Sequence, residues 1–406
     1  MKNLLIFSIT YFFVAVGGLP GFVLDRTGIA FLGALAMVVS GAILPADALA
    51  SIHFPTIFLL FGLMMISAQF RLGGFYTYIA DRIAASMASP ETFLLILMLI
   101  SAGLSALLAN DIVCLAFTPV IAAALIRKRR NPVPFLLGIA IAANIGSAAT
   151  IIGNPQNMFI GQVGSLGFGR FFLWCFPPVA ASLAASYFIL RFLYRKSFHD
   201  EWKPRHALPE DQPLPFNRWQ STKGMIVLTS VIALFFTPIP RELTVMVAAG
   251  LLLCSRTTKT EQLMSLVDWQ LITFFCGLFI VIRGLTVTGM PVHIIEWFSS
   301  HGISLAQPYL LSGLSLALSN IVSNVPATML LAPHIAAGDT HSWYVLALSS
   351  TFAGNLITIG SIANLITFQI AKKAGVEISF LEHAKAGIPV TAASMALLCG
   401  WIFIAG

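Results

Sequence analysis

Charged residues are scarce in this chain. Only 10% of its 406 residues are charged, whereas 58% are hydrophobic and the mean hydropathy is +0.89. An average soluble domain contains about 25% charged residues, and a soluble protein of this length could not cover its surface with so few. The composition therefore predicts a polytopic membrane protein. The net charge of +7 does not indicate nucleic-acid binding, because the basic residues lie in short loops between apolar segments, where they set topology.

Sequence motifs of enzymes and of metal sites are also absent. The chain has no His-Glu-x-x-His, Gly-x-Ser-x-Gly, Walker lysine loop or Gly-x-Gly-x-x-Gly motif. Its five cysteines form neither a Cys-x-x-Cys pair nor a Cys/His cluster. We therefore expect no catalytic residues, no metal and no cofactor. A transporter without a nucleotide-binding module must be driven by an ion gradient or by the membrane potential.

A polar motif occurs twice, once in each hydrophobic half of the chain. The stretch that begins at Asn110-Asp111 aligns without a gap with the stretch that begins at Asn324-Val325, at an offset of 214 residues. A polar, glycine-containing cluster follows each motif, and its members are Asn144, Thr150, Gly153, Asn154, Pro155, Gln156 and Asn157 in the first half and Asn355, Thr358, Gly360, Ser361 and Asn364 in the second. Hydrophobic halves that are interrupted at corresponding places point to the binding site of a secondary transporter.

The apolar segments around these motifs predict two kinds of irregular element. Segments 91–126 and 306–337 are too long for one span of about 20 residues and too short for two, so we predict a re-entrant hairpin in each half. The clusters that follow predict broken helices over 133–164 and 342–371. In the first of these, Gly153 and Pro155 cannot sustain a regular helix.

The chain is therefore predicted to be an all-α polytopic membrane protein with two inverted repeats, each containing spanning helices, a re-entrant hairpin and a broken helix. Residues 1–195 form the first half and 223–406 the second, and the polar, proline-bearing segment 196–222 is the predicted cytoplasmic linker. Basic residues at 127–130 follow the first hairpin, whereas 338–342 after the second contains no Lys or Arg. Such opposite charge bias implies opposite orientations.

A third match supports the duplication. Gly62 aligns with Gly277, and Gly74 aligns with Gly289, at an offset of 215 residues. A single-residue insertion or deletion therefore separates this block from the hairpin block.

Asp111 is the residue most indicative of function. It is the only acidic residue between Glu91 and Asp200, and its place near a hairpin tip predicts a carboxylate within the membrane, which is costly and functional by default. We expect it to accept the coupling proton or to bind a cation. The structural alternative is a carboxylate that caps the second hairpin arm. The aligned residue is Val325, and the sequence indicates no acidic or histidine partner for Asp111.

The predicted substrate site combines this carboxylate with neutral donors and acceptors from both halves. Its members are Asn110, Asp111, Thr150, Gly153, Asn154, Asn157, Ser323, Asn324, Asn355, Thr358, Ser361 and Asn364. Backbone groups freed at helix breaks are tolerated in a membrane where they line a cavity. Ordinary hydrogen bonding between helices is the alternative explanation for these residues.

The motifs resemble those of the ion transporter superfamily. Asn110-Asp111, the run from Gly153 to Asn157 and the run from Ser323 to Pro326 are most similar to the arsenite permease (ArsB) and sodium/proton antiporter (NhaD) branch. Dicarboxylate/sodium symporters of the superfamily carry Ser-Asn-Thr in both halves, which this chain lacks. The resemblance implies a scaffold of spanning helices and a transport domain of two hairpins and two broken helices.

The resemblance also implies a function, namely efflux of arsenite or antimonite driven by the proton motive force. Such a neutral hydroxide needs hydrogen-bond partners and no fixed counter-charge, as the predicted site offers. A sodium/proton antiporter and a transporter of dicarboxylates or other inorganic anions are the alternatives. The expected partners are the small inorganic substrate, protons and the lipid bilayer of a bacterial inner (plasma) membrane. A homodimer and a cytoplasmic ATPase subunit are compatible with the resemblance.

Overall fold

The computed structural model describes residues 1–19, 21–85, 89–198, 200, 202, 216–255, 258–290, 293, 307–336 and 338–405. The regular structure of these residues is helical. The helices of the first half are α1 (Lys2–Val16), α2 (Arg26–Val39), α3 (Pro45–Ser51), α4 (Phe54–Leu72), α5 (Phe75–Ala85), α6 (Pro90–Leu108), α7 (Asn110–Arg127), α8 (Val133–Ser147), α9 (Pro155–Val163) and α10 (Phe168–Tyr194).

The helices of the second half follow the same order. They are α11 (Arg218–Leu234), α12 (Arg241–Leu253), α13 (Thr260–Met264), α14 (Trp269–Thr286), α16 (Pro308–Val322), α17 (Asn324–Leu331), η1 (Ala332–His334), α18 (Thr340–Ala353), η2 (Thr358–Gly360), α19 (Ile362–Lys373) and α20 (Phe380–Ala405). Helices α1–α4 thus correspond to α11–α14, and α6–α10 correspond to α16–α20. The two inverted repeats that the sequence predicts are confirmed.

Long apolar helices make the chain a polytopic membrane protein. Within the described residues, α4, α6, α7, α10, α14 and α20 are long and apolar enough to cross a membrane. Several other helices are apolar but shorter, among them α1, α2, α8 and α16. Short helices of this kind are expected in a transporter whose helices are interrupted near the binding site.

Both predicted hairpins are present, and each reverses at a single residue. Helices α6 and α7 meet at Ala109, which has a φ of 65°, and α16 and α17 meet at Ser323, which has a φ of 78°. Positive φ values are uncommon for residues other than glycine. The offset of 214 residues between these two positions shows that the repeats share an unusual turn as well as a sequence motif. Residues 306 and 337, at the ends of the second predicted hairpin, lie outside the described residues.

Both predicted broken helices are also present. The first is interrupted between α8 and α9, and the second between α18 and α19. Helix α8 is buried along its whole length, and α18 is buried from Ser342 onward. A helix that is apolar all round and fully enclosed lies at the centre of a bundle, so the two breaks lie at the centre of the molecule.

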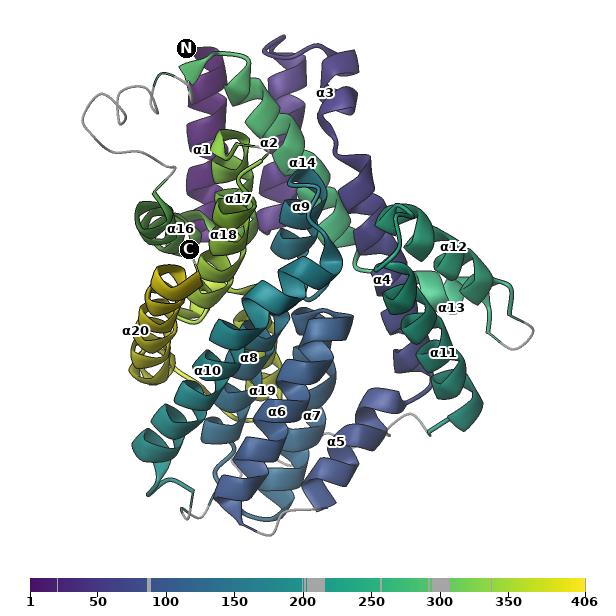
Figure 1. Cartoon of the computed structure of the whole chain (residues 1–406), viewed down its shortest axis with the longest axis vertical. Coiled ribbons are helices and arrows are strands. Elements are labelled where there is room, and N and C mark those ends of the chain that lie inside the picture. The colour runs from purple at the N-terminus through teal and green to yellow at the C-terminus, as the bar shows by residue number, and fades with distance from the viewer. Residues whose placement is uncertain are drawn as a thin grey trace.

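The helices form two groups (Figure 1). The core comprises α6–α9 and α16–α19, with α7 packed on α19 and α9 packed on α17, so that the halves interleave. The frame comprises α1, α2, α4, α11, α12 and α14, which lie at the top and right of the view. Helices α10 and α20 pack against each other and against the core. Contacts of α4 with α9 and of α14 with α17 join the frame to the core.

Equivalent glycines allow close helix crossings in the frame. A Cβ atom on Gly62 in α4 would lie 2.5 Å from Val245 Cγ2 in α12, and one on Gly277 in α14 would lie 2.9 Å from the backbone of Ala30 in α2. Gly62 and Gly277 are 215 residues apart, as are Ala30 and Val245. The same crossing is therefore built twice. The other aligned glycine pair, at 74 and 289, has positive φ in both halves.

The predicted linker 196–222 lies partly outside the described residues. Helix α11 begins at Arg218, before the predicted end of the linker, and Asn217 caps it by accepting a hydrogen bond from Gln220 N. The backbone N–H of Asn217 also donates to Gly73 O at 2.9 Å, which ties the start of the second half to the end of α4. The boundaries of the two halves stay a prediction.

Candidate functional site

A buried asparagine near the end of α8, Asn144, connects the two halves. Its Oδ1 accepts hydrogen bonds from Asn110 Nδ2 at 3.1 Å and from Ser361 Oγ at 2.8 Å. Its Nδ2 donates to Asn355 Oδ1 at 2.9 Å and to Asn364 Oδ1 at 3.0 Å. An asparagine side chain offers two donors and two acceptor sites, so this one is fully used. The fold thus gathers four predicted site residues from both repeats around one side chain.

A second set of hydrogen bonds surrounds the break between α8 and α9. Asn154 precedes α9 and accepts a hydrogen bond from Asn157 N at 2.9 Å. Its Nδ2 donates to Ser147 Oγ at 2.9 Å and to Thr351 Oγ1 in α18 at 3.3 Å. Asn157 Nδ2 donates to the backbone oxygen of Thr150 at 3.0 Å. This set also crosses from the first half to the second.

Each hairpin tip is held by the helix break of its own half. The backbone N–H of Asn110 donates to Gly153 O at 3.0 Å. When the Asn324 side-chain amide is oriented so that its oxygen and its nitrogen both have hydrogen-bond partners, Nδ2 donates to Gly360 O at 3.0 Å. Gly153 and Gly360 are equivalent in the repeats, at an offset of 207 residues. The break in each half therefore contacts the motif asparagine of its own hairpin, through the backbone N–H of Asn110 in the first half and through the side-chain amide of Asn324 in the second.

The remaining predicted residues lie around this network. Thr150 Oγ1 donates to Ala106 O in α6, and Ser323 forms the turn of the second hairpin. Four polar atoms of predicted residues are enclosed without a hydrogen-bond partner in the part of the chain that is described: Asn110 Oδ1, Asn157 Oδ1, Asn355 Nδ2 and Thr358 Oγ1. Native proteins leave few such groups unpaired, and a bound water, ion or ligand commonly explains them.

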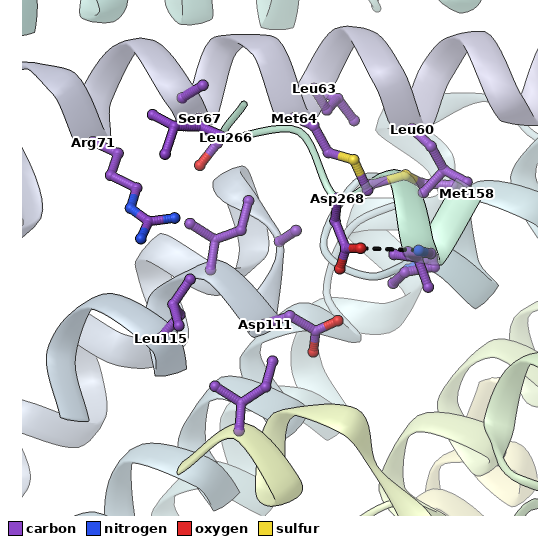
Figure 2. Close-up of a pocket in the computed structure, with 16 residues that line it drawn as sticks. Leu60, Leu63, Met64, Ser67, Arg71, Asp111, Leu115, Met158, Leu266 and Asp268 are labelled. Atoms are coloured by element: carbon purple, nitrogen blue, oxygen red, sulfur yellow. Dashed lines mark hydrogen bonds between the residues drawn. The ribbon is translucent and has the colours of Figure 1, made fainter. Parts of the chain in front are cut away.

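Asp111 does not belong to this network but lines a cavity of about 90 Å³ beside it. The cavity lies between core and frame, with Asp111 at the start of α7, Ser67 and Arg71 on α4, and Asp268 immediately before α14. Figure 2 shows both carboxylates on one side of this space and the Arg71 guanidinium on the other. Arg71 and Asp268 are exposed and Asp111 is half-buried, so the cavity leads from the surface toward Asp111. We call it the Asp111 cavity.

The charges of the Asp111 cavity favour cations or neutral solutes. Asp268 caps α14 by accepting a hydrogen bond from Leu271 N at 2.9 Å, and its charge interacts with that of Asp111. The Asp111 carboxylate has no hydrogen bond or ion pair with another described residue. Its place in the first turn of α7 also lets the helix dipole stabilise its charge. The N-cap residue of α7 is Ala109 and no side chain caps the helix, so Asp111 acts on the helix only through the dipole and its carboxylate stays free at the cavity.

Sequence reasoning missed the partners of Asp111. The sequence indicates no acidic or histidine partner for Asp111, whereas in the structure Asp268 lines the same cavity. An acidic residue directly before an apolar run is a helix-start signal, which could have drawn attention to Asp268. No local signal places it beside residue 111, because that contact depends on how the frame packs against the core. Arg71 directly follows an apolar run, and basic residues at such positions usually set the orientation of a spanning helix. Its sequence position therefore gave no sign that it lines a cavity.

Comparisons with known proteins agree with this architecture. A family model with the description CitMHS, citrate transporter, matches residues 10–353. An uncharacterized transporter of Mycobacterium tuberculosis is 33% identical over 404 residues, covering 94% of each chain. The silicon efflux transporter LSI3 of rice is 26% identical, covering 95% of this chain and 94% of LSI3.

A putative transporter named arsB of Dictyostelium discoideum is also similar, at 26% identity over 91% of this chain and 85% of that protein. Among solved structures, the YdaH transporter of Alcanivorax borkumensis superposes with a TM-score of 0.59 at 12% identity. That match covers 99% of this chain and 95% of YdaH. It shows the same fold, and at this identity it carries no information about the solute.

Proposed function

This chain belongs to the CitMHS citrate transporter family and is therefore a secondary transporter, and we propose that it exports arsenite or antimonite in exchange for protons. The single observation that carries this proposal is the unpaired carboxylate of Asp111 in a small cavity beside a network of neutral amides and hydroxyls. We further propose that it does so in a bacterial inner membrane, where a proton motive force is available.

The neutral network suits a neutral hydroxide. Trivalent arsenic and antimony hydroxides carry hydroxyl groups that both donate and accept hydrogen bonds. The enclosed, unpaired atoms Asn110 Oδ1 and Asn157 Oδ1 are acceptors, and Asn355 Nδ2 is a donor. A solute with hydroxyl groups would satisfy both kinds. The names of two relatives, a silicon efflux transporter and a putative arsB, support a metalloid solute.

Size and charge make citrate a poor fit to the Asp111 cavity. At about 90 Å³ the cavity is well below the roughly 300 Å³ at which ordinary ligand pockets begin. With Asp111, Asp268 and Arg71 all ionised, its lining carries a net negative charge. A tricarboxylate would be repelled there unless cations entered with it. The family description therefore gives the transporter class, and the chemistry of this chain favours another solute.

Asp111 is the proposed coupling group. It lies on the core while Asp268 and Arg71 lie on the frame, so movement of one group against the other would change the charges around it. A carboxylate whose neighbours change between two states takes up a proton in one and releases it in the other. Solute export and proton import would be linked if the solute binds only one of these states.

Sodium/proton antiport is the second candidate, and the pairing of Asp111 with Asp268 favours it. Two carboxylates in one cavity are suitable ligands for a hard cation such as sodium. Both functions use the same carboxylate, and they differ in whether the cavity takes a cation or a neutral hydroxide.

The proposal is tested by growth of an arsenite-sensitive, efflux-deficient bacterium on graded arsenite and antimonite. We expect the native chain to confer resistance and Asp111→Asn to abolish it at equal membrane abundance, because the amide cannot exchange a proton. Glu91→Gln, which removes a carboxylate from the first turn of α6, is the matched control and should retain resistance. Everted vesicles should show arsenite uptake that a protonophore stops.

Two results would redirect the proposal. If the native chain is abundant in the membrane but confers no resistance, the metalloid solute is rejected. Sodium-dependent proton movement in the same vesicles would then establish the antiporter, and sodium-dependent uptake of a carboxylate would establish an anion transporter. If Asp111→Asn retains full resistance, proton coupling through this residue is rejected, whatever the solute.

A further inference from the structure

A second cavity, of about 340 Å³, also lies between the frame and the core. Its lining includes His53 before α4, Arg283 and Thr286 on α14, Phe159 on α9 and Met329 on α17. We call it the distal cavity. None of its residues was part of the predicted site, and the proposed function does not use it.

The same two frame helices connect both cavities. Helix α4 starts beside His53 at the distal cavity and ends beside Arg71 at the Asp111 cavity. Helix α14 runs the opposite way, from Asp268 at the Asp111 cavity to Thr286 at the distal one. Eighteen residues of helix span about 27 Å. The two cavities therefore lie at opposite ends of these helices.

The internal repeat relates the two linings residue by residue. His53 is equivalent to Asp268 and Arg71 to Thr286, both at the frame offset of 215. Further equivalent pairs lie on frame and core: Met64 and Phe279, Ser67 and Ile282, Ala68 and Arg283, Leu115 and Met329, and Ile366 and Phe159. Two cavities that arise at equivalent positions of an inverted repeat face opposite sides of the membrane.

The chemistry of the two linings differs. Val325 replaces Asp111 on the hairpin, and His53 replaces Asp268 before the frame helix. The His53 ring bonds through Nδ1 to Thr56 Oγ1 at 2.9 Å, and its Nε2 has no partner among the described residues. Burial lowers the pKa of His53 below its ordinary value, and the nearby Glu242 partly opposes this. The Arg283 side chain is exposed, and its guanidinium has no hydrogen bond or ion pair with another residue in the described part of the chain.

We propose that the distal cavity is a second binding site for the transported solute, at the membrane face opposite the Asp111 cavity. Arg283 and His53 Nε2 would contact the oxygens of a small solute, as would the Thr286 hydroxyl, whose proton is donated to Ile282 O. The identity of this solute rests on the proposed function, whereas the position of the site rests on the repeat. Without a hairpin carboxylate, this site lacks the coupling group and serves for release after the coupled step.

Space-filling variants test the sidedness of the two sites. Thr286→Phe should raise the half-saturating arsenite concentration by about five-fold or more when arsenite is offered at the distal face, and change it by less than about two-fold at the other face. Ser67→Phe, which fills the Asp111 cavity, should show the reverse pattern. Right-side-out and everted vesicles present the two faces separately. Equal effects of Thr286→Phe on both faces, or none on either, would overturn the proposal.

A measurement that needs no solute separates this inference from the proposed function. The end of the predicted cytoplasmic linker contacts the Arg71 end of α4, so the distal cavity at the other end is expected to face outward. In a chain whose native cysteines are replaced, Thr286→Cys should therefore react with a membrane-impermeant maleimide in right-side-out vesicles and be protected in everted ones. Arg71→Cys, at the equivalent exposed position of the Asp111 cavity, should behave in the opposite way. Labelling of both from one side refutes the assignment of the cavities to opposite faces, even if arsenite is not the solute. If the two cysteines are labelled from opposite sides in a chain that moves no arsenite, the assignment of the two cavities to opposite faces stands and only arsenite as the solute is rejected.

Discussion

At the scale of single residues, the hydrogen bonds of Asn144 join the two repeats at the centre of the core. It is 1% exposed, and its four partners come from the first hairpin and from the second broken helix. Because water cannot replace a lost partner in this enclosed position, each unpaired group would retain its desolvation cost. A side chain that joins four groups of two repeats in this way couples their positions.

Replacing Asn144 by alanine should therefore destabilise the protein by about 2–3 kcal/mol, because several buried groups lose their partner together. Thermal unfolding in detergent should show this as a lower midpoint. Ser186→Ala is the control, because the Ser186 hydroxyl only donates to Ser182 O within its own helix, and its midpoint should stay near the native value. An unchanged midpoint for Asn144→Ala would show that the network contributes little.

The imidazole of His53 should make stability depend on pH. Burial keeps its pKa in the folded chain below the unfolded value, which is about 6.5. Below that pH the unfolded chain binds the extra proton more readily, so stability falls as the pH drops from 7 toward 5. Glu242 is the acidic group that acts on this ring, and Asp47 and Arg283 line the same cavity.

His53→Gln should remove this part of the pH dependence. The unfolding midpoint of the variant should therefore drop less between pH 7 and pH 5 than that of the native chain. The other histidines contribute equally to both proteins and cancel in the difference. Parallel pH profiles for the two proteins would exclude a folding-linked titration of His53.

At the scale of elements, the two hairpins share a backbone turn that favours glycine. Ala109 has φ and ψ values of 65° and 135°, and Ser323 has values of 78° and 159°. Side chains in such conformations cost of order 1–3 kcal/mol, and strain of this kind is concentrated at functional sites. Each strained residue directly precedes the motif asparagine, so the turn determines where that asparagine points.

Ala109→Gly should therefore relieve strain and raise the unfolding midpoint by an amount that corresponds to about 1 kcal/mol, because the relief exceeds the added entropy of the unfolded chain. Ala116→Gly in the interior of α7 is the control, and it should lower the midpoint because glycine is unfavourable within a helix. Ala109→Val should lower the unfolding midpoint below that of the native chain, because a β-branched side chain is strained at positive φ. A fall in the midpoint for Ala109→Gly equal to that of the control would contradict a strained turn.

At the scale of the whole molecule, the frame is held by two equivalent helix crossings through Gly62 and Gly277. A Cβ at either position would meet the opposite helix at 2.5 Å or 2.9 Å, closer than real contacts allow. The crossings join α4 of the first repeat to α12 of the second, and α14 of the second to α2 of the first. The halves are therefore interleaved in the frame as they are in the core.

Gly277→Ala should separate α14 from α2 and destabilise the protein by about 1–3 kcal/mol. Gly62→Ala should have the same effect, because the repeat makes the two sites equivalent. Gly250→Ala in α12 is the matched control: no atom lies within 4 Å of the added Cβ, and helix propensity favours alanine there. Its unfolding midpoint in detergent should equal or exceed that of the native chain. Similar midpoints for all three variants would refute the close crossings.

The sequence predicted most of the fold because its signals are local. Scarce charge and long apolar segments indicate a polytopic membrane protein, since lipid selects for composition directly. The repeated Asn motif and the glycine- and proline-containing clusters located both hairpins and both breaks, because residues such as Gly153 and Pro155 disfavour a continuous helix through their own backbone chemistry. The boundaries of the linker stay a prediction, although α11 already begins at Arg218.

The sequence by itself thus determined the class of protein, the repeat and the place of each interruption, and it identified Asp111 as the exceptional residue. Only the tertiary structure decided what surrounds that residue. Asp268 and Arg71 come to the Asp111 cavity from the frame, and His53 comes to the distal cavity from its repeat-equivalent position. The reason is physical: a helix break depends on neighbouring residues, whereas a cavity between two groups of helices depends on packing between segments far apart in the chain.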